Sequence, residues 1–92
     1  MLINDFLTYL QYEKRYSPLT LQAYSADLLQ FDSFLKEQVA VSVELAKSVD
    51  VKNFMVEQLQ KGLTESAVNR KLSSLKSFYK FLHREGVIAT NP

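Results

Sequence analysis

Apolar residues recur along this 92-residue chain at spacings of three and four, the period that places side chains on one face of an α-helix. The pattern runs through four stretches and fades between them. It predicts helices over residues 2–14, 18–37, 49–61 and 65–84, with no internal repeat and no second domain. We therefore expect one all-α domain, a compact four-helix bundle.

Capping residues mark where these helices begin and end. Ser17 before Pro18 predicts the start of the second helix, because the serine oxygen accepts an orphan amide and proline has none to leave unpaired. Ser48 and Thr64 are the expected N-caps of the third and fourth helices. Gly62 is expected to end the third, since glycine adopts the left-handed conformation freely.

The stretch between the second and third helices is ambiguous. Val39, Val41 and Val43 alternate with other residues as they would in a β-strand. A single strand without a partner is unstable in water, so we expect an extended connection or an irregular turn.

The composition is that of an ordinary globular domain, with 47% hydrophobic and 23% charged residues. The chain has no cysteine, which excludes disulfides and thiolate metal sites. Asn4 and Asp5 interrupt any signal-peptide core, and no apolar run approaches the ~20 residues that span a bilayer. We expect a soluble, cytoplasmic protein.

Nothing in the sequence indicates a catalytic site. His83 is the one histidine, and it has no acidic or nucleophilic partner at a catalytic or metal-binding spacing. Glycines stand only at 62 and 86, which excludes a glycine-rich phosphate loop. We therefore expect no catalytic residue, no metal and no cofactor, and a chain that is not an enzyme by itself.

The net charge of +1 hides an asymmetry along the chain. Residues 1–60 contain five Lys/Arg and eight Asp/Glu, a net charge of −3, whereas residues 61–92 contain six and two, a net charge of +4. Positive charge is therefore concentrated in the last third, where it could meet an anionic partner.

The last predicted helix has two faces of different character. Its apolar face consists of Val68, Leu72, Leu75, Tyr79 and Leu82. Its opposite face carries Asn69, Arg70, Ser73, Lys76, Ser77, Lys80 and Arg84. The segment from Ser66 to Arg84 has no acid, and its amides and hydroxyls could bind phosphates or base edges, so an uninterrupted cationic face for DNA is one interpretation. A solvated lysine-rich surface is the other.

Two groups of aromatic residues leave a second function open. Phe78 and Phe81 flank the apolar face of the last helix and are expected to pack against other helices rather than stack on bases. The aromatic side of the first helix is expected to be partly exposed, and it consists of Phe6, Tyr9, Tyr12 and Tyr16. This side could serve bundle packing or dock another subunit, which makes a helical protein–protein interaction module without DNA binding the alternative function.

Several segments resemble a known family. They are residues 16–24, YSPLTLQAY, with Asp27-Leu28 and residues 31–35, FDSFL, and the more specific run from Gly62 to Leu82. With the closing residues 85–88, EGVI, and Asn91-Pro92, they resemble the N-terminal core-binding domain of tyrosine recombinases of the Xer and phage-integrase type. The resemblance implies a SAM-like four-helix bundle that forms one jaw of a clamp on a double-stranded DNA half-site.

The resemblance also implies which residues approach DNA. From the second helix these are Thr20 and Gln22, and from the fourth they are Asn69, Arg70, Ser73, Lys76 and Lys80. We add Ser77 because it lies on the same outward face of the fourth helix. The first helix would contact other recombinase protomers in the synaptic complex, and the isolated domain would be monomeric. Residues 1–92 would form the N-terminal DNA-binding domain and end at the linker to a catalytic domain that this sequence does not contain.

The sequence departs from the family pattern in two places. Relatives commonly carry arginine after the tyrosine of the second helix, where this chain has Ser25-Ala26, so its second helix has less charge for phosphates. The arginines, histidines and nucleophilic tyrosine of the recombinase active site are absent. Strand exchange would therefore require the rest of a longer protein.

Overall fold

The computed structural model describes residues 2–92 and is helical through most of that range. Its elements are α1 (Leu2–Tyr12), α2 (Pro18–Gln38), the short 3-10 helix η1 (Val43–Leu45), α3 (Ser48–Gln60) and α4 (Glu65–Arg84). The four predicted α-helices are confirmed over the described residues, and every boundary lies within two residues of its expected position. The fold class, an all-α bundle, is also confirmed.

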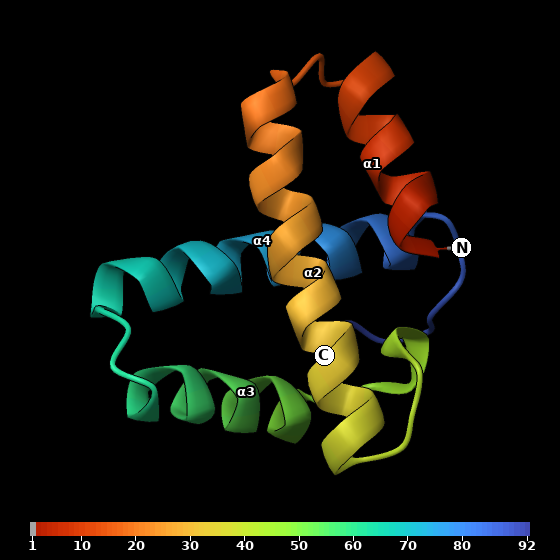
Figure 1. Ribbon diagram of the computed structural model, residues 1–92. Helices are drawn as coiled ribbons and strands as arrows, with labels where there is room; N and C mark the ends of the chain where they lie inside the picture. Colours follow the sequence, from red (N-terminus) through yellow and green to blue (C-terminus); the bar gives the residue numbers. More distant parts are fainter. Residues whose placement is uncertain (1) are drawn as a thin grey trace.

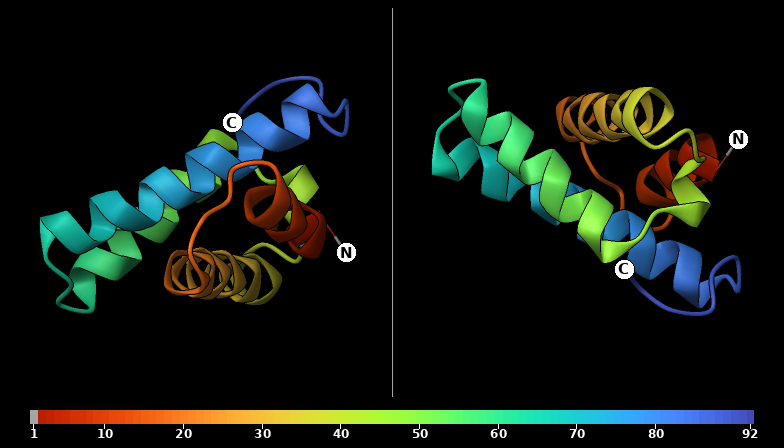
Figure 2. Two further views of the ribbon diagram at one scale, coloured as in Figure 1. Left: turned by 90° about the horizontal axis from the view of Figure 1, so that it is seen from above. Right: turned by 90° about the horizontal axis from the view of Figure 1, so that it is seen from below.

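The helices form two antiparallel pairs that cross each other. α1 and α2 lie side by side, and α3 and α4 lie side by side across them (Figure 1). The two views of Figure 2 show the same pairing from above and below. α2 and α4 pack together where the two pairs cross, so the face that α4 turns inward meets α2.

Local interactions at the helix ends explain most boundaries. Ser17 Oγ accepts a hydrogen bond from the Thr20 amide at 3.3 Å, and Thr64 Oγ1 accepts one from the Ala67 amide at 3.2 Å, which confirms both predicted caps. Gly62 has φ +92° and follows Lys61, the C-cap of α3, which confirms its role in ending that helix.

The start of α3 and the end of α1 differ from their expected positions for identifiable reasons. Ser48 is the first residue of α3 rather than its cap, because the carboxylate of Asp50 accepts the Lys47 amide at 2.9 Å and starts the helix one residue earlier. α1 ends at Tyr12 instead of residue 14. The chain turns there because Arg15 has φ 55° and the Tyr16 amide reaches back to the Leu10 carbonyl at 3.1 Å.

The connection over residues 39–47 is irregular, as expected, and contains no strand. Ala40 has φ 59°, and η1 follows three residues later. Val43 is buried, so this connection contributes to the core although the sequence did not place it there.

A row of aromatic rings crosses the core and joins all four helices. The ring centre of Phe6 on α1 lies 5.5 Å from that of Phe78 on α4, and the ring centre of Phe78 lies 5.2 Å from that of Tyr79. Tyr79 in turn faces Phe31 of α2 at 6.4 Å, and Phe31 lies 5.2 Å from Phe54 of α3. Edge-on and tilted contacts of this kind add to the burial of each ring. The prediction that Tyr79 is a core residue is confirmed.

Candidate nucleic-acid interface

The outward side of α4 presents polar and cationic residues at helical spacing. Asn69, Ser73, Lys76 and Lys80 are exposed, and Ser77 is partly buried beside them. Residues three and four apart in a helix are neighbours on its surface, so these side chains form one strip along α4. In the described part of the chain, neither Lys76 nor Lys80 has a carboxylate within ion-pair distance.

The predicted cationic face is not uninterrupted, because an acid from α2 reaches it. Asp27 accepts hydrogen bonds from Arg70 Nη1 at 2.9 Å and from Arg70 Nη2 at 3.3 Å. The expectation of a face free of carboxylates is therefore wrong at Arg70. The sequence shows no acid within α4, but it does not show which acids other helices bring to it.

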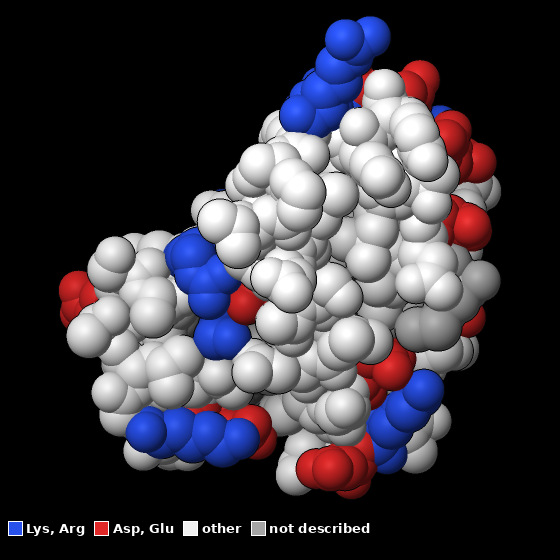
Figure 3. Space-filling model, turned by 45° about the horizontal axis from the view of Figure 1, so that its top comes forward, with Lys and Arg blue, Asp and Glu red and all other residues white. Residues whose placement is uncertain are grey.

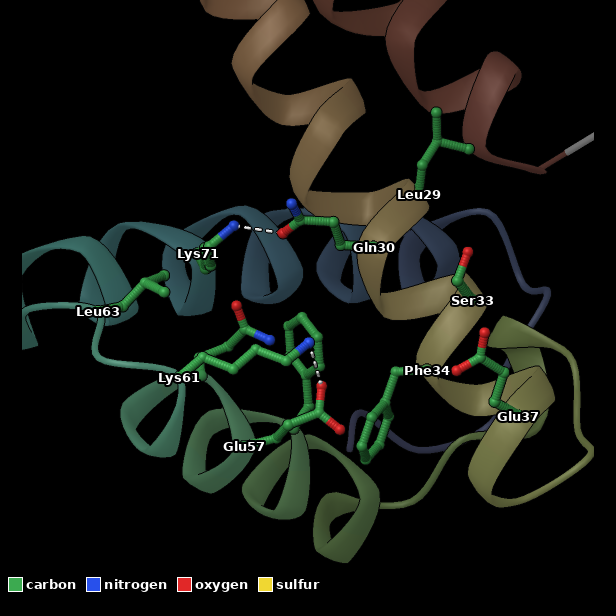
Figure 4. A pocket seen from close by; sticks show the side chains of 11 residues that line it. Leu29, Gln30, Ser33, Phe34, Glu37, Glu57, Lys61, Leu63 and Lys71 are labelled. Atoms are coloured by element: carbon green, nitrogen blue, oxygen red, sulfur yellow. Dashed lines mark hydrogen bonds and ion pairs between the residues drawn. The ribbon is translucent and has the colours of Figure 1, made fainter.

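Asp27 is the centre of a buried polar cluster between α2 and α4. Its carboxylate also accepts hydrogen bonds from Lys71 Nζ at 3.2 Å and from Ser74 Oγ at 2.8 Å. Lys71 donates a second bond to Gln30 Oε1, and Figure 4 shows its side chain pointing from α4 toward Gln30 on α2. We call Asp27, Gln30, Arg70, Lys71 and Ser74 the Asp27 cluster.

Burial makes the bond between Asp27 and Lys71 important for stability. Asp27 is 1% exposed and Lys71 is 5% exposed, so both charges have lost most of their hydration. A buried charge is tolerated when it is paired and hydrogen-bonded, and removing one partner of such a pair costs about 3–5 kcal/mol. In the described residues, no buried side-chain polar atom lacks a partner.

Three of the predicted DNA-binding residues meet in a groove between α2 and α4. This α2/α4 groove has a volume of about 390 Å³, and it is lined by Leu19, Thr20, Ala23, Tyr24, Arg70, Ser73 and Ser74. Thr20 Oγ1 lies 2.9 Å from Ser17 Oγ, and Ser73 Oγ donates to the Asn69 carbonyl at 3.1 Å. Gln22 is exposed on α2 but lies outside the lining of the groove.

Ser77 and Lys80 line a different groove, between α1 and the last turns of α4. This α1/α4 groove has a volume of about 460 Å³ and also contains Lys14 and Arg84. Arg84 lies 4.4 Å from the centre of the Tyr9 ring and donates a 2.9 Å hydrogen bond to the Tyr9 hydroxyl, which raises the pKa of Arg84. The guanidinium of Arg84 therefore already interacts with an aromatic side chain, whereas the ammonium of Lys80 does not.

Positive charge is distributed in patches. Figure 3 shows a face on which Lys and Arg side chains form separate groups, some of them beside Asp or Glu, with uncharged surface between them. A third groove, between α2 and α3, contains the Lys61–Glu57 ion pair at 3.2 Å, whose charges offset each other (Figure 4). Affinity for an anion would therefore depend on particular side chains more than on a broad field.

The described residues hold no group of three or more His, Cys, Asp or Glu side chains that could bind a metal ion. His83 is exposed at the end of α4. Within the same range, no helix combines the length and the apolar character that crossing a bilayer requires.

The predicted core roles of Phe78 and Phe81 are confirmed, since Phe78 is 0% and Phe81 is 9% exposed. The aromatic side of α1 is divided: Phe6 is buried, Tyr9 lies under Arg84, and Tyr12 is 70% exposed. α1 therefore uses its aromatic residues mainly for packing and leaves one of them on the surface.

The chain that folds into these two crossed helix pairs matches a known protein family over nearly its whole length. Residues 3–86 match the family model described as phage integrase, N-terminal SAM-like domain, and the chain belongs to this family. The resemblance found in the sequence is confirmed.

The relatives are bacterial proteins named tyrosine recombinase XerC. The chain is 46% identical over 89 residues to that of Listeria monocytogenes serotype 4a (strain HCC23), covering 97% of this chain and 30% of the relative. It is 44% identical over 96 residues to that of Chlorobaculum parvum, covering 98% of this chain and 29% of the relative. Identity to that of Bacillus subtilis is 41% over 90 residues, covering 98% and 30%. No solved structure matches the chain. The chain thus spans about 30% of the length of these relatives.

Proposed function

We propose that this chain is the N-terminal DNA-binding domain of a site-specific tyrosine recombinase and closes on one side of a duplex half-site. Membership of the phage-integrase SAM-like family and the recombinase names of the relatives support the class of protein. On this proposal the chemistry of strand exchange belongs to another domain of a longer protein, and residues 1–92 contribute binding and orientation.

The observation that carries the proposal is the exposed strip on α4, in which Lys76 and Lys80 have no acidic partner in the described structure. Lysines bind DNA by neutralising phosphates and releasing condensed counterions. Asn69 lies among them and offers an amide that hydrogen-bonds phosphate oxygens or base edges, whereas Ser73 would first have to turn its hydroxyl away from the Asn69 carbonyl. Thr20 and Gln22 would approach the same duplex from α2.

A salt titration tests this proposal. The chain is titrated against a fluorescein-labelled duplex at several salt concentrations, and the slope of log K against log [salt] is measured by anisotropy. Lys76→Ala and Lys80→Ala should each make the slope shallower by about 0.9, because each removes one phosphate contact. Weak binding is expected, since non-specific contacts to one side of a duplex give dissociation constants of about 10⁻⁴–10⁻⁶ M.

Lys52→Ala is the matched control, because Lys52 is an exposed lysine on α3, away from the strip. It removes the same charge and should leave the slope unchanged. If Lys76→Ala and Lys80→Ala retain the parent slope, the strip does not bind phosphate. If the salt slope becomes shallower by the same amount in all three variants, the protein binds through its overall charge and the proposed site on α4 is wrong.

A second function is favoured by one observation on α1. Tyr12, the last residue of α1, is 70% exposed. Tyr16, in the loop that follows, is still 38% exposed although its ring centre lies 5.8 Å from that of Tyr24. We infer that this end of α1 contacts another protein, and a neighbouring recombinase protomer is the partner that the family implies. Amide shifts limited to residues 6–16 on adding a protein partner, with none over residues 69–80 on adding duplex, would favour interaction without DNA binding.

A further inference from the structure

The Asp27 cluster holds one more positive charge than its carboxylate can neutralise. Asp27 pairs with Lys71 at 3.2 Å and with Arg70 at 2.9 Å, so one anion faces two cations. The Lys71 side chain is 7% exposed, whereas that of Arg70 is 53% exposed. Because Lys71 lies inside, it is the cation that compensates Asp27 in the low-dielectric interior. The surplus charge of the cluster therefore appears at the surface on Arg70.

Arg70 is held in place but retains donors for another ligand. Its two terminal nitrogens form a fork on the Asp27 carboxylate, one bond from Nη1 and one from Nη2. A guanidinium has five N–H donors in a rigid plane, so three of them remain. Arg70 lines the α2/α4 groove, where solvent reaches half of its side chain. The groups beside it, Thr20 and Ser73, already form hydrogen bonds within the protein.

We propose that Asp27 is a positioning residue for DNA binding: it fixes the guanidinium of Arg70 in the α2/α4 groove so that its remaining N–H groups meet a backbone phosphate. Lys71 supplies the internal charge that leaves Arg70 cationic toward solvent. The inference rests on the proposed function, because it assigns Asp27 a positioning role on the same DNA-binding surface. It also separates Arg70, an oriented donor, from Lys76 and Lys80, which act as freely moving charges.

The physical gain is preorganisation. A long side chain that is ordered only on binding loses rotamer freedom at that moment, and a side chain already held in the bound geometry does not. Arginine benefits most, because its planar fork must match the phosphate oxygens in direction as well as distance. Releasing Arg70 should therefore weaken duplex binding by about threefold to tenfold, the range expected for one ordered side chain.

A double-mutant cycle in duplex binding tests the assignment. To avoid stranding a buried lysine, the variant is Asp27→Asn with Lys71→Met, which removes both internal charges together. It is measured with Arg70 present and with Arg70→Ala. When Arg70 is present, the Asp27→Asn, Lys71→Met change should lower the affinity for duplex threefold to tenfold. In the Arg70→Ala background, the same change should not lower the affinity further. Circular dichroism checks that each protein is folded. An equal loss in both backgrounds would make the Asp27 cluster a structural link alone and overturn the proposal.

A spectroscopic measurement on the unmodified chain keeps the proposal testable if the variants unfold. The Nε–Hε group of Arg70 should be as rigid as the backbone and should shift when duplex is added, whereas Arg15, exposed before α2, should be mobile. A mobile Arg70, or an Arg70→Ala protein that binds duplex as the parent does, overturns the inference. Neither result affects the salt-slope test of Lys76 and Lys80, so the two failures can be distinguished. If the parent itself binds no duplex, both the function and the inference are wrong.

Discussion

The hydroxyl of Tyr79 on α4 donates a 2.7 Å hydrogen bond to the carbonyl oxygen of Val43, in the connection between α2 and α3. Both residues are buried, so water cannot replace either partner. The bond attaches an irregular segment to the central helix, and Val43 packs beside it in the core. A connection that has few regular backbone bonds is thereby held at a fixed place.

Tyr79→Phe should destabilise the protein by about 1 kcal/mol, because the Val43 carbonyl loses its side-chain donor and keeps only the 3.3 Å bond from the Ala46 amide, while the aromatic ring keeps its packing. Urea denaturation followed by circular dichroism measures the change. Tyr12→Phe is the control, since Tyr12 is exposed on α1 and its hydroxyl is free to bond with water. Equal stabilities for the two variants would mean that the bond to Val43 contributes nothing.

The same tyrosine should make the protein sensitive to alkali. Burial, with the nearby Glu44 and Asp50 carboxylates, raises the pKa of Tyr79 well above its usual value near 10. Above about pH 10 the unfolded chain loses this proton while the folded chain keeps it, so stability falls as pH rises, by up to about 1.4 kcal/mol per unit. The Tyr79→Phe variant should be less stable than the parent at neutral pH, but its free energy of unfolding should fall less steeply than that of the parent between pH 10 and 11. Urea unfolding at each pH measures both.

The aromatic row should be the most sensitive part of the core. Phe31 is 0% exposed and contacts Phe54 and Tyr79, so Phe31→Ala removes a ring from the point where α2, α3 and α4 meet. The expected loss is about 3–5 kcal/mol, much of the stability of a small domain. Leu29→Ala, at a 46% exposed position on the same helix, should cost far less. Thermal unfolding of the pair measures the difference, and similar losses would contradict the burial pattern.

The helices were predictable because their signals are local. Apolar spacing and the caps at Ser17, Thr64 and Gly62 act within a few residues, and the structure uses all three. The Asp27 cluster was missed because its bonds join residues 43, 44 and 47 positions apart. A signal was nevertheless present: Asp27 lies between Tyr24 and Phe31 on the apolar stripe of α2. A charge at such a position requires a partner, and Lys71 occupies the equivalent place on α4.

The sequence suggested that α2 has lost charge for DNA, and the structure allows this to be tested by restoring it. Ala26 is exposed and lies one helical turn after Gln22, on the side of α2 that would face the duplex. Ala26→Arg should strengthen duplex binding and steepen the salt slope by about 0.9, since one more phosphate is neutralised. The slope is measured by anisotropy, as for the lysine variants on α4.

Asn4→Arg is the matched control for this gain of function, because Asn4 is exposed on α1 and the substitution adds the same charge elsewhere. It should leave the slope unchanged. A steeper slope for both variants would mean that added charge acts wherever it is placed. If the slope is unchanged in both variants, α2 is not part of the interface and Gln22 does not contact DNA. The α4 strip is tested separately by the lysine variants. Only a response limited to Ala26→Arg places both helices against one duplex.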